Sequence, residues 1–197
     1  MQKRRKHPPA VPTAQSLHNV ALFYLSRYAA SEGGLRRVLQ NRLRKAALLH
    51  PDFSRDAAKQ AELRNAIETI VEKNRKSGIL NDAAYASMKA ESLRRGGRSR
   101  RYILQKLQQK GLAVETIGKA LRDADGPEKD GSEAEMKAAY AFAKKRKFGI
   151  FRKVKADEAR LHKELGSFAR AGFSLDVARR VLGKKASEDF DLDSGLD

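Results

Sequence analysis

The sequence of 197 residues contains no cysteine. Disulfide frameworks, thiolate metal sites and catalysis by a cysteine nucleophile are therefore excluded. The sequence also has no run of about 18 apolar residues, so we expect no membrane-spanning helix. Its basic start, Lys3-Arg4-Arg5-Lys6, is followed by three prolines rather than by the apolar segment of a signal peptide. We therefore expect a cytoplasmic protein with no membrane partner.

Motifs for catalysis and cofactor binding are also missing. The four histidines are scattered, and none has a partner histidine at metal-ligand spacing. No P-loop is present, and the sequence offers no buried acid–base pair. Asp123 and Asp125 form only a fragment of a calcium loop, so we predict a solvated linker there. The sequence predicts a protein that is not an enzyme and that holds no metal or cofactor.

Signals for β-strands are nearly absent, and residues that favour helices dominate. Ser31, Ser99 and Ser174 stand where N-caps are expected. Pro51 is predicted to end a helix before a turn at 52–54, and Ser132 with Glu135 has the S-x-x-E spacing of a capping box. Glycines follow several apolar stripes and are predicted to terminate helices at Gly78, Gly96–Gly97, Gly111 and Gly172. The pattern predicts an all-α protein.

Two parts of the chain are similar to one another. The segment 83–89 matches 138–144, and the apolar and glycine positions of 104–121 match those of 165–182 in order and spacing. Residues 17–78 fit the same plan more loosely, with an insertion near 50–59. Short helical repeats must stack on their neighbours to bury their apolar faces, so we predict an elongated curved solenoid of three tandem three-helix repeats. The predicted parts are a disordered basic arm (1–15), repeat 1 (16–80), repeat 2 (81–125), a linker (126–131), repeat 3 (132–183) and a disordered acidic tail (184–197).

The charge of the chain is strongly unbalanced. Its 42 Lys and Arg residues against 24 Asp and Glu give a formal net charge of +18. Such a field favours polyanions or an acidic protein surface as partners. We expect any binding to free DNA to be weak and electrostatic. A solvated basic surface also favours a monomer.

The stretch SLRRGGRSRRY, residues 92–102, crowds five arginines around a glycine pair. Arg94 and Arg95 suit the C-terminus of a helix, where cations are favourable. Arg100 and Arg101 fall in the first turn of the next helix, where acidic residues are preferred. We therefore expect an external anion to offset their charge. The alternative is a solvated bend, in which arginine stems simply cover apolar surface.

Several of these residues carry a resemblance to a known family. The segments 78–82 (GILND), 85–86 (YA), 95–96 (RG), 100–101 (RR) and 104–111 (LQKLQQKG) resemble the central repeat of the bacterial RecX regulators. The segment 168–174 (FARAGFS) is similar to the end of their third repeat, with Ala171 in place of a second basic residue. The resemblance extends over about residues 17–183. The first repeat departs from the family through its insertion.

The resemblance implies a helical protein that binds the RecA recombinase filament on DNA. Such regulators inhibit strand exchange and ATP hydrolysis by the recombinase and have no catalytic activity of their own. The residues expected to contact the filament are Arg94, Arg95, Arg98, Arg100, Arg101, Lys106, Lys110 and Arg170.

Two other functions stay open on the residues alone. A general DNA-binding helical protein without a recombinase partner would also suit the charge. The best candidate for its recognition helix is 114–122. This helix has only Lys119 and Arg122 as residues that could contact base edges, which is little for base recognition. A nuclease would need metal-binding carboxylates, which we cannot assemble from the sequence.

Overall fold

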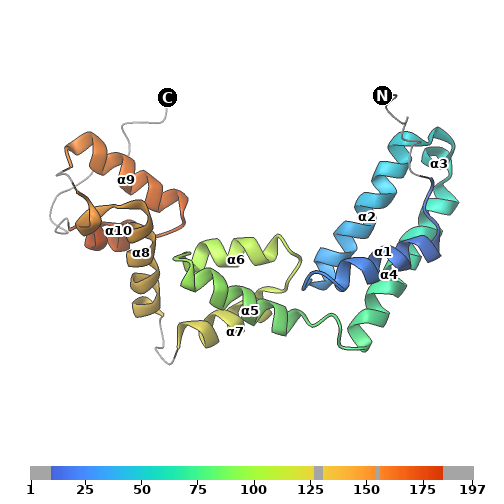
Figure 1. The fold of residues 1–197 in the computed structure, drawn as a ribbon, viewed down its shortest axis with the longest axis horizontal. Helices are drawn as coiled ribbons and strands as arrows, with labels where there is room; N and C mark the ends of the chain where they lie inside the picture. Colours follow the sequence, from blue (N-terminus) through green and yellow to red (C-terminus); the bar gives the residue numbers. More distant parts are fainter. Residues whose placement is uncertain (1–9, 127–130, 154–155, 184–197) are drawn as a thin grey trace, which may run out of the picture. The chain divides into compact units, whose positions relative to one another are not determined.

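A computed structural model describes residues 10–126, 131–153 and 156–183 (Figure 1). These residues form ten α-helices and one short 3-10 helix, with no strand among them, so the predicted all-α class is confirmed. Most of the predicted basic arm and the whole acidic tail lie outside the described residues. No helix within the described ranges is long and apolar enough to cross a membrane.

The chain folds into two compact units, which are described separately. The first unit runs to Tyr85 and also contains Lys110–Leu112. The second unit contains Ala86–Gln109 and the chain from Ala113 onward.

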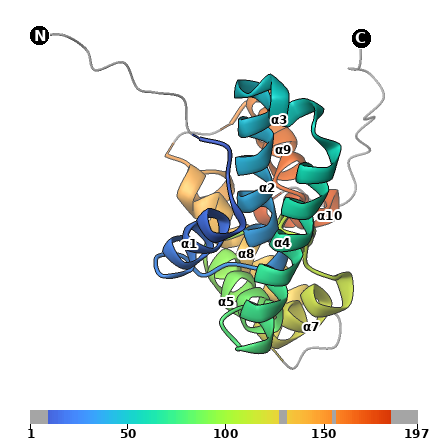
Figure 2. The ribbon, with the colours of Figure 1, turned by 90° about the vertical axis from the view of Figure 1, so that its right-hand side faces the viewer.

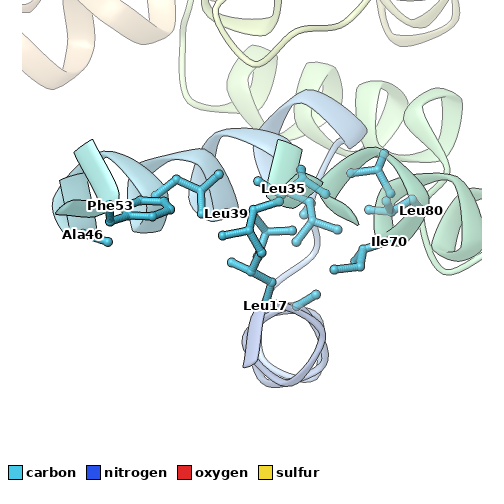
Figure 3. Close-up of a cluster of buried hydrophobic side chains, with 13 residues drawn as sticks. Leu17, Leu35, Leu39, Ala46, Phe53, Ile70 and Leu80 are labelled. Atoms are coloured by element: carbon cyan, nitrogen blue, oxygen red, sulfur yellow. The ribbon is translucent and has the colours of Figure 1, made fainter. Parts of the chain in front are cut away.

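Four helices build most of the first unit: α1 (Ala14–Leu25), α2 (Glu32–Leu49), α3 (Pro51–Arg55) and α4 (Ala57–Lys76). The helices α2 and α4 lie side by side, and α1 contacts both (Figures 1 and 2). Apolar residues at spacings of three and four place one stripe of each helix in a shared core (Figure 3). Complete burial of each Leu or Ile there contributes roughly 1.5–3 kcal/mol. The first turn of α5, Asp82–Tyr85, also belongs to this unit.

The start of α1 and the region around Pro51 differ from the predictions. The helix α1 begins at Ala14, inside the segment that was expected to be a disordered arm, and Thr13 caps it. Pro51 was predicted to precede a turn, but it occupies the first turn of α3. This position suits proline, because its fixed φ is helical and its missing N–H has no partner there. The short helix α3 brings Phe53 into the core (Figure 3).

The second unit contains the remainder of α5 (Asp82–Arg95), then α6 (Arg100–Gln108), α7 (Val114–Asp125), α8 (Ser132–Arg146), the 3-10 helix η1 (Gly149–Phe151), α9 (Glu158–Arg170) and α10 (Leu175–Leu182). An aromatic cluster lies between α8, α9 and α10. The ring centroid of Phe142 is 5.0 Å from that of Phe168 and 5.6 Å from that of Phe173. Each such pair contributes about 0.5–1.5 kcal/mol beyond area burial.

The capping box predicted at the start of α8 does not form. Gly131 is the N-cap in a left-handed conformation, and Ser132 is already helical. The Glu135 carboxylate accepts hydrogen bonds from Arg94 and from the backbone N–H of Arg100. These two donors lie in the arginine bend, so tertiary contacts outweigh the local capping preference.

Candidate binding surface at the arginine bend

The bend between α5 and α6 has a fixed backbone. The N–H of Arg98 donates to the carbonyl of Leu93 at 3.0 Å, and that of Gly97 donates to Arg94 at 2.9 Å. This pair of bonds is the Schellman ending of a helix, which requires the left-handed conformation that Gly97 adopts (φ 72°). A Cβ at Gly97 would stand 2.8 Å from the backbone nitrogen of Phe142 in α8. Glycine is therefore needed for both its conformation and its close contact.

A buried ion cluster lies beneath the bend. The Arg94 guanidinium donates to both carboxylate oxygens of Asp125, at 2.7 and 2.9 Å, and to Glu135. Only 8% of the Arg94 side chain and 2% of the Asp125 side chain are exposed. Burial alone would lower the pKa of Arg94, but the hydrogen bonds to Asp125 and Glu135 outweigh it and raise that pKa. Arg94 is therefore a charged structural residue whose donors are turned inward.

The charge of Arg100 is offset from within the unit. Its guanidinium lies 2.9 Å from Asp125, and its backbone N–H donates to Glu135 at 2.9 Å. A carboxylate thus stands at the N-terminus of α6, as the helix dipole favours. The expectation that an external anion must compensate Arg100 is therefore wrong. The prediction of a solvated linker at Asp125 is also wrong, because its side chain is buried in this cluster.

Ser99 joins α6 to a distant turn of the same unit. Its hydroxyl donates to the carbonyl of Ala171 at 2.7 Å and accepts from the N–H of Tyr102 at 3.1 Å. Gly172 packs so closely that a Cβ there would stand 2.6 Å from the Ser99 hydroxyl. One side chain therefore caps a helix and holds a neighbouring turn.

The first unit contains the same arrangement. The Ser31 hydroxyl donates to the carbonyl of Lys110 at 2.7 Å and accepts from the N–H of Gly34 at 3.0 Å. The N–H of Glu32 donates to Asp82 at 2.8 Å, as Arg100 donates to Glu135. We call each set a serine–glycine junction, formed by a capping serine, a carboxylate and the carbonyl that precedes a glycine.

The predicted contact residues fall into three groups. Arg94 and Arg100 are engaged inside the second unit, as described above. Arg95, Arg101, Lys106 and Arg170 are exposed on that unit, and Arg98 is half-buried with its guanidinium 4.7 Å from the Tyr102 ring centroid. Among the described residues, no carboxylate pairs with any of these five cations. Lys110 belongs to the first unit, where its carbonyl is part of the junction.

Two hollows lie beside these cations in the second unit. One, of about 500 Å³, is lined by three arginines, two carboxylates and several apolar side chains, which include Arg100, Arg101, Arg180, Glu135, Asp176, Leu104, Met136 and Val177. The other, of about 450 Å³, is lined by Gly96, Arg98, Phe142, Lys145, Arg146 and Phe148.

Sequence reasoning missed four residues of this region. Asp125 and Glu135 gave no local sign that they would meet the bend. Lys145 and Arg146 belong to a visible run of four cations, 144–147, but cations at the end of a helix have an ordinary explanation in its dipole. No cluster of His, Asp and Glu that could hold a metal ion occurs in the part of the chain that the structure describes.

The fold and the bend together define an all-α protein that repeats one junction in two units and carries a cationic surface beside the second. The family model of the RecX second three-helix domain matches residues 81–121. The regulatory protein RecX of Myxococcus xanthus is 38% identical over 184 residues, which cover 91% of this chain and 92% of that protein. The regulatory protein RecX of Agrobacterium fabrum is 34% identical, over 92% of this chain and 91% of its own length. The chain belongs to the RecX family of regulatory proteins.

Proposed function

We propose that this RecX-family protein binds the RecA recombinase filament on DNA and inhibits its ATP hydrolysis and strand exchange. It acts as a binding protein and has no catalytic activity of its own. It functions as a monomer in the cytoplasm. Membership of a family of regulatory proteins supports this proposal, as does the net charge of +18.

One observation carries the proposal for the bend: its outer arginines form no ion pair with any carboxylate that the structure describes. Arg94 and Arg100 satisfy the buried carboxylates, whereas no described carboxylate pairs with Arg95 or Arg101. Exposed guanidinium groups on a rigid backbone bind carboxylates and phosphates through paired N–H donors. Arg95, Arg98, Arg101, Lys106 and Arg170 are therefore the proposed direct contacts, and Arg94 and Arg100 hold the bend that presents some of them.

The hollow beside Arg101 suits a protein surface of the filament. Its lining combines apolar side chains of α6, α8 and α10 with three arginines, and its two carboxylates, Glu135 and Asp176, are already paired with arginines of the same unit. Such a combination resembles the centre and rim of a protein interface, where arginine is enriched and apolar side chains are desolvated. We infer that an acidic and partly apolar segment of the recombinase binds there.

The proposal is tested by the DNA-dependent ATPase of the recombinase. Increasing amounts of the protein should lower the rate, and the protein should pellet with filaments more strongly than with bare DNA. The purified protein alone should neither hydrolyse ATP nor cleave DNA in the presence of Mg²⁺. Unchanged recombinase ATPase at saturating protein, or equal capture by bare DNA and filaments, would contradict the proposal.

A further inference from the structure

The basic hollow is the strongest unassigned feature of the second unit. It has a volume of about 450 Å³, and its lining among the described residues contains three cations, Arg98, Lys145 and Arg146, but no acidic residue. Cations that surround a concave surface reinforce one another's potential and concentrate anions there. In the protein alone, the like charges of this hollow repel one another. An anionic ligand would relieve that repulsion.

Two of the three cations are held in place before any ligand arrives. The guanidinium carbon of Arg98 is 4.7 Å from the centroid of the Tyr102 ring, and that of Arg146 is 5.2 Å from the centroid of Phe142. Stacking of this kind restricts the planar guanidinium group and leaves its N–H donors at the edges. The ligand therefore loses little affinity to the ordering of these side chains.

The backbone of the hollow is rigid for a reason already described. The carbonyl of Arg98 accepts a hydrogen bond from the buried Arg94 at 3.3 Å, and Gly97 contacts the backbone of α8. The ion cluster therefore fixes the position from which Arg98 enters the hollow. This link gives the buried Arg94 an indirect part in binding.

The adjoining residue Lys147 adopts an unusual conformation. Its φ of 57° is the only positive value among the described residues that are not glycine. It occupies the left-handed position that ends α8. The N–H of Lys147 donates to the carbonyl of Lys144, and the N–H of Phe148 donates to the carbonyl of Ala143, which are the two bonds of a Schellman ending. Glycine is the usual residue there, since another residue costs about 1–2 kcal/mol in this conformation. A lysine in this place adds exposed positive charge beside the hollow at the expense of stability.

We propose that this basic hollow binds the phosphodiester backbone of single-stranded DNA. Arg98, Lys145 and Arg146 contact phosphates, and the half-buried ring of Phe148 offers a face or edge to a base. Positive grooves lined with aromatic rings bind single strands in this way, without a preference for sequence. The inference rests on the proposed function and deepens it, because it assigns Arg98, one of the proposed filament contacts, to the DNA of the filament and adds Lys145 and Arg146 to it.

The test measures binding to a labelled oligo-dT strand by fluorescence anisotropy, without recombinase, over a range of salt concentrations. The variant K145A/R146A should bind at least about tenfold more weakly at low salt. Its plot of log affinity against log salt should be less steep by about 1.4, since each lost phosphate contact to a single strand contributes about 0.7. The matched control is K119A/R122A, which removes one exposed Lys and one exposed Arg from α7 of the same unit.

A second variant avoids any loss of packing at Phe142. Lys145 is exposed in the last turn of α8, so K145E should lower the melting temperature by only a few degrees and should still weaken binding of the strand. Unchanged affinity in both hollow variants would overturn the inference. An equal loss in K119A/R122A would also overturn it, because net charge or the helix α7, rather than the hollow, would then account for binding.

Failure of this inference is distinguishable from failure of the proposed function. If the parent protein inhibits the recombinase and the hollow variants bind oligo-dT normally, the hollow assignment is wrong and the proposed function stands. If the hollow variants lose oligo-dT binding and the parent protein does not inhibit the recombinase, the hollow assignment stands and the proposed function fails.

Discussion

The two serine–glycine junctions share their backbone contacts and differ in their charge. Before Ser31, the bend of the first unit reads Ser26-Arg27-Tyr28-Ala29-Ala30, whereas Arg94-Arg95-Gly96-Gly97-Arg98 precedes Ser99. The single arginine of the first bend, Arg27, lies 4.1 Å from the Phe23 ring centroid. Both serines nevertheless donate to their carbonyls at 2.7 Å. The junction therefore does not require a cluster of arginines around its bend.

The comparison separates two tasks within the second bend. Arg94 lies in the last turn of α5 and forms a buried ion pair with Asp125 and Glu135, whereas Ser26 of the first bend is exposed. The other arginines add charge that the equivalent junction lacks, and Arg95 and Arg101 direct it outward. Stability should therefore depend on the inner residue and binding on the outer ones.

The largest effect on stability is expected for Arg94→Ala. The substitution leaves Asp125 buried with Arg100 as its remaining partner, and breaking a buried ion pair in this way costs about 3–5 kcal/mol. For a protein of this size the melting temperature should fall by roughly 6–20 °C. The control is Ser26→Ala in the bend of the first unit, where the side chain is exposed, and it should cost less than about 0.5 kcal/mol. Equal melting temperatures of the two variants would show that Arg94 contributes no more to stability than Ser26 does.

The next effect concerns the close contacts of the junction glycines. Gly111, Gly172 and Gly183 all have left-handed φ values, of 84°, 84° and 80°. A Cβ at Gly111 would stand 2.9 Å from the Cα of Gly33, and a Cβ at Gly172 would stand 2.6 Å from the Ser99 hydroxyl. A Cβ at Gly183 would meet nothing within 4 Å. Alanine at either junction should therefore lower the free energy of unfolding by about 1–3 kcal/mol more than Gly183→Ala. Urea denaturation of the three variants measures this, and three equal losses would show that the junctions are loosely packed.

The capping serines should behave alike despite the different charges around them. Ser31→Ala and Ser99→Ala each remove a helix cap and leave a backbone carbonyl without its hydroxyl donor. Each should lower the free energy of unfolding by about 1–2 kcal/mol. Ser174 caps α10 but makes no such bond to a distant carbonyl of the described chain, so Ser174→Ala should cost less, about 0.5–1 kcal/mol. A loss confined to Ser99→Ala would mean that the arginine cluster, rather than the shared contacts, determines junction stability.

The smallest effect is expected at Lys147, and its sign is opposite. Lys147→Gly relieves the left-handed conformation but adds freedom to the unfolded chain, so the net gain should be roughly 0.5–1 kcal/mol. The same change at Lys144, inside α8, should instead destabilise by about 0.5–1 kcal/mol. If Lys147 serves the hollow, Lys147→Gly should also reduce the salt dependence of oligo-dT binding by about 0.7. A more stable variant with unchanged binding would show that Lys147 has no part in the hollow.

Local signals predicted much of the fold. The caps at Ser31, Ser99 and Ser174 and the helix ends near Gly78, Gly97 and Gly172 follow from residues within one turn of each boundary. Helix class, cap position and glycine conformation are local properties of the backbone, so a single sequence reveals them. The error at Pro51 arose because proline both follows helices and begins them, and the burial of Phe53 favours the second arrangement.

The inner part of the site could not be predicted in this way. Asp125 and Glu135 lie 31 and 41 residues from Arg94, and neither position has a local pattern that marks a buried partner. The sequence did indicate that the first turn of α6 required an anion. It did not reveal that carboxylates of the same chain supply it, because that depends on how α7 and α8 pack. The outer arginines were recognisable from their density alone.

The division between inner and outer arginines is tested most directly by Arg95→Gln/Arg101→Gln. Glutamine keeps most of each aliphatic stem and removes only the charge, so the account predicts a melting temperature within about 2 °C of the parent. The same variant should inhibit the recombinase ATPase at least about tenfold more weakly, as expected for the loss of two charge-assisted contacts. Inhibition equal to that of the parent protein would contradict the account, and so would a large fall in melting temperature, because the outer arginines would then be structural.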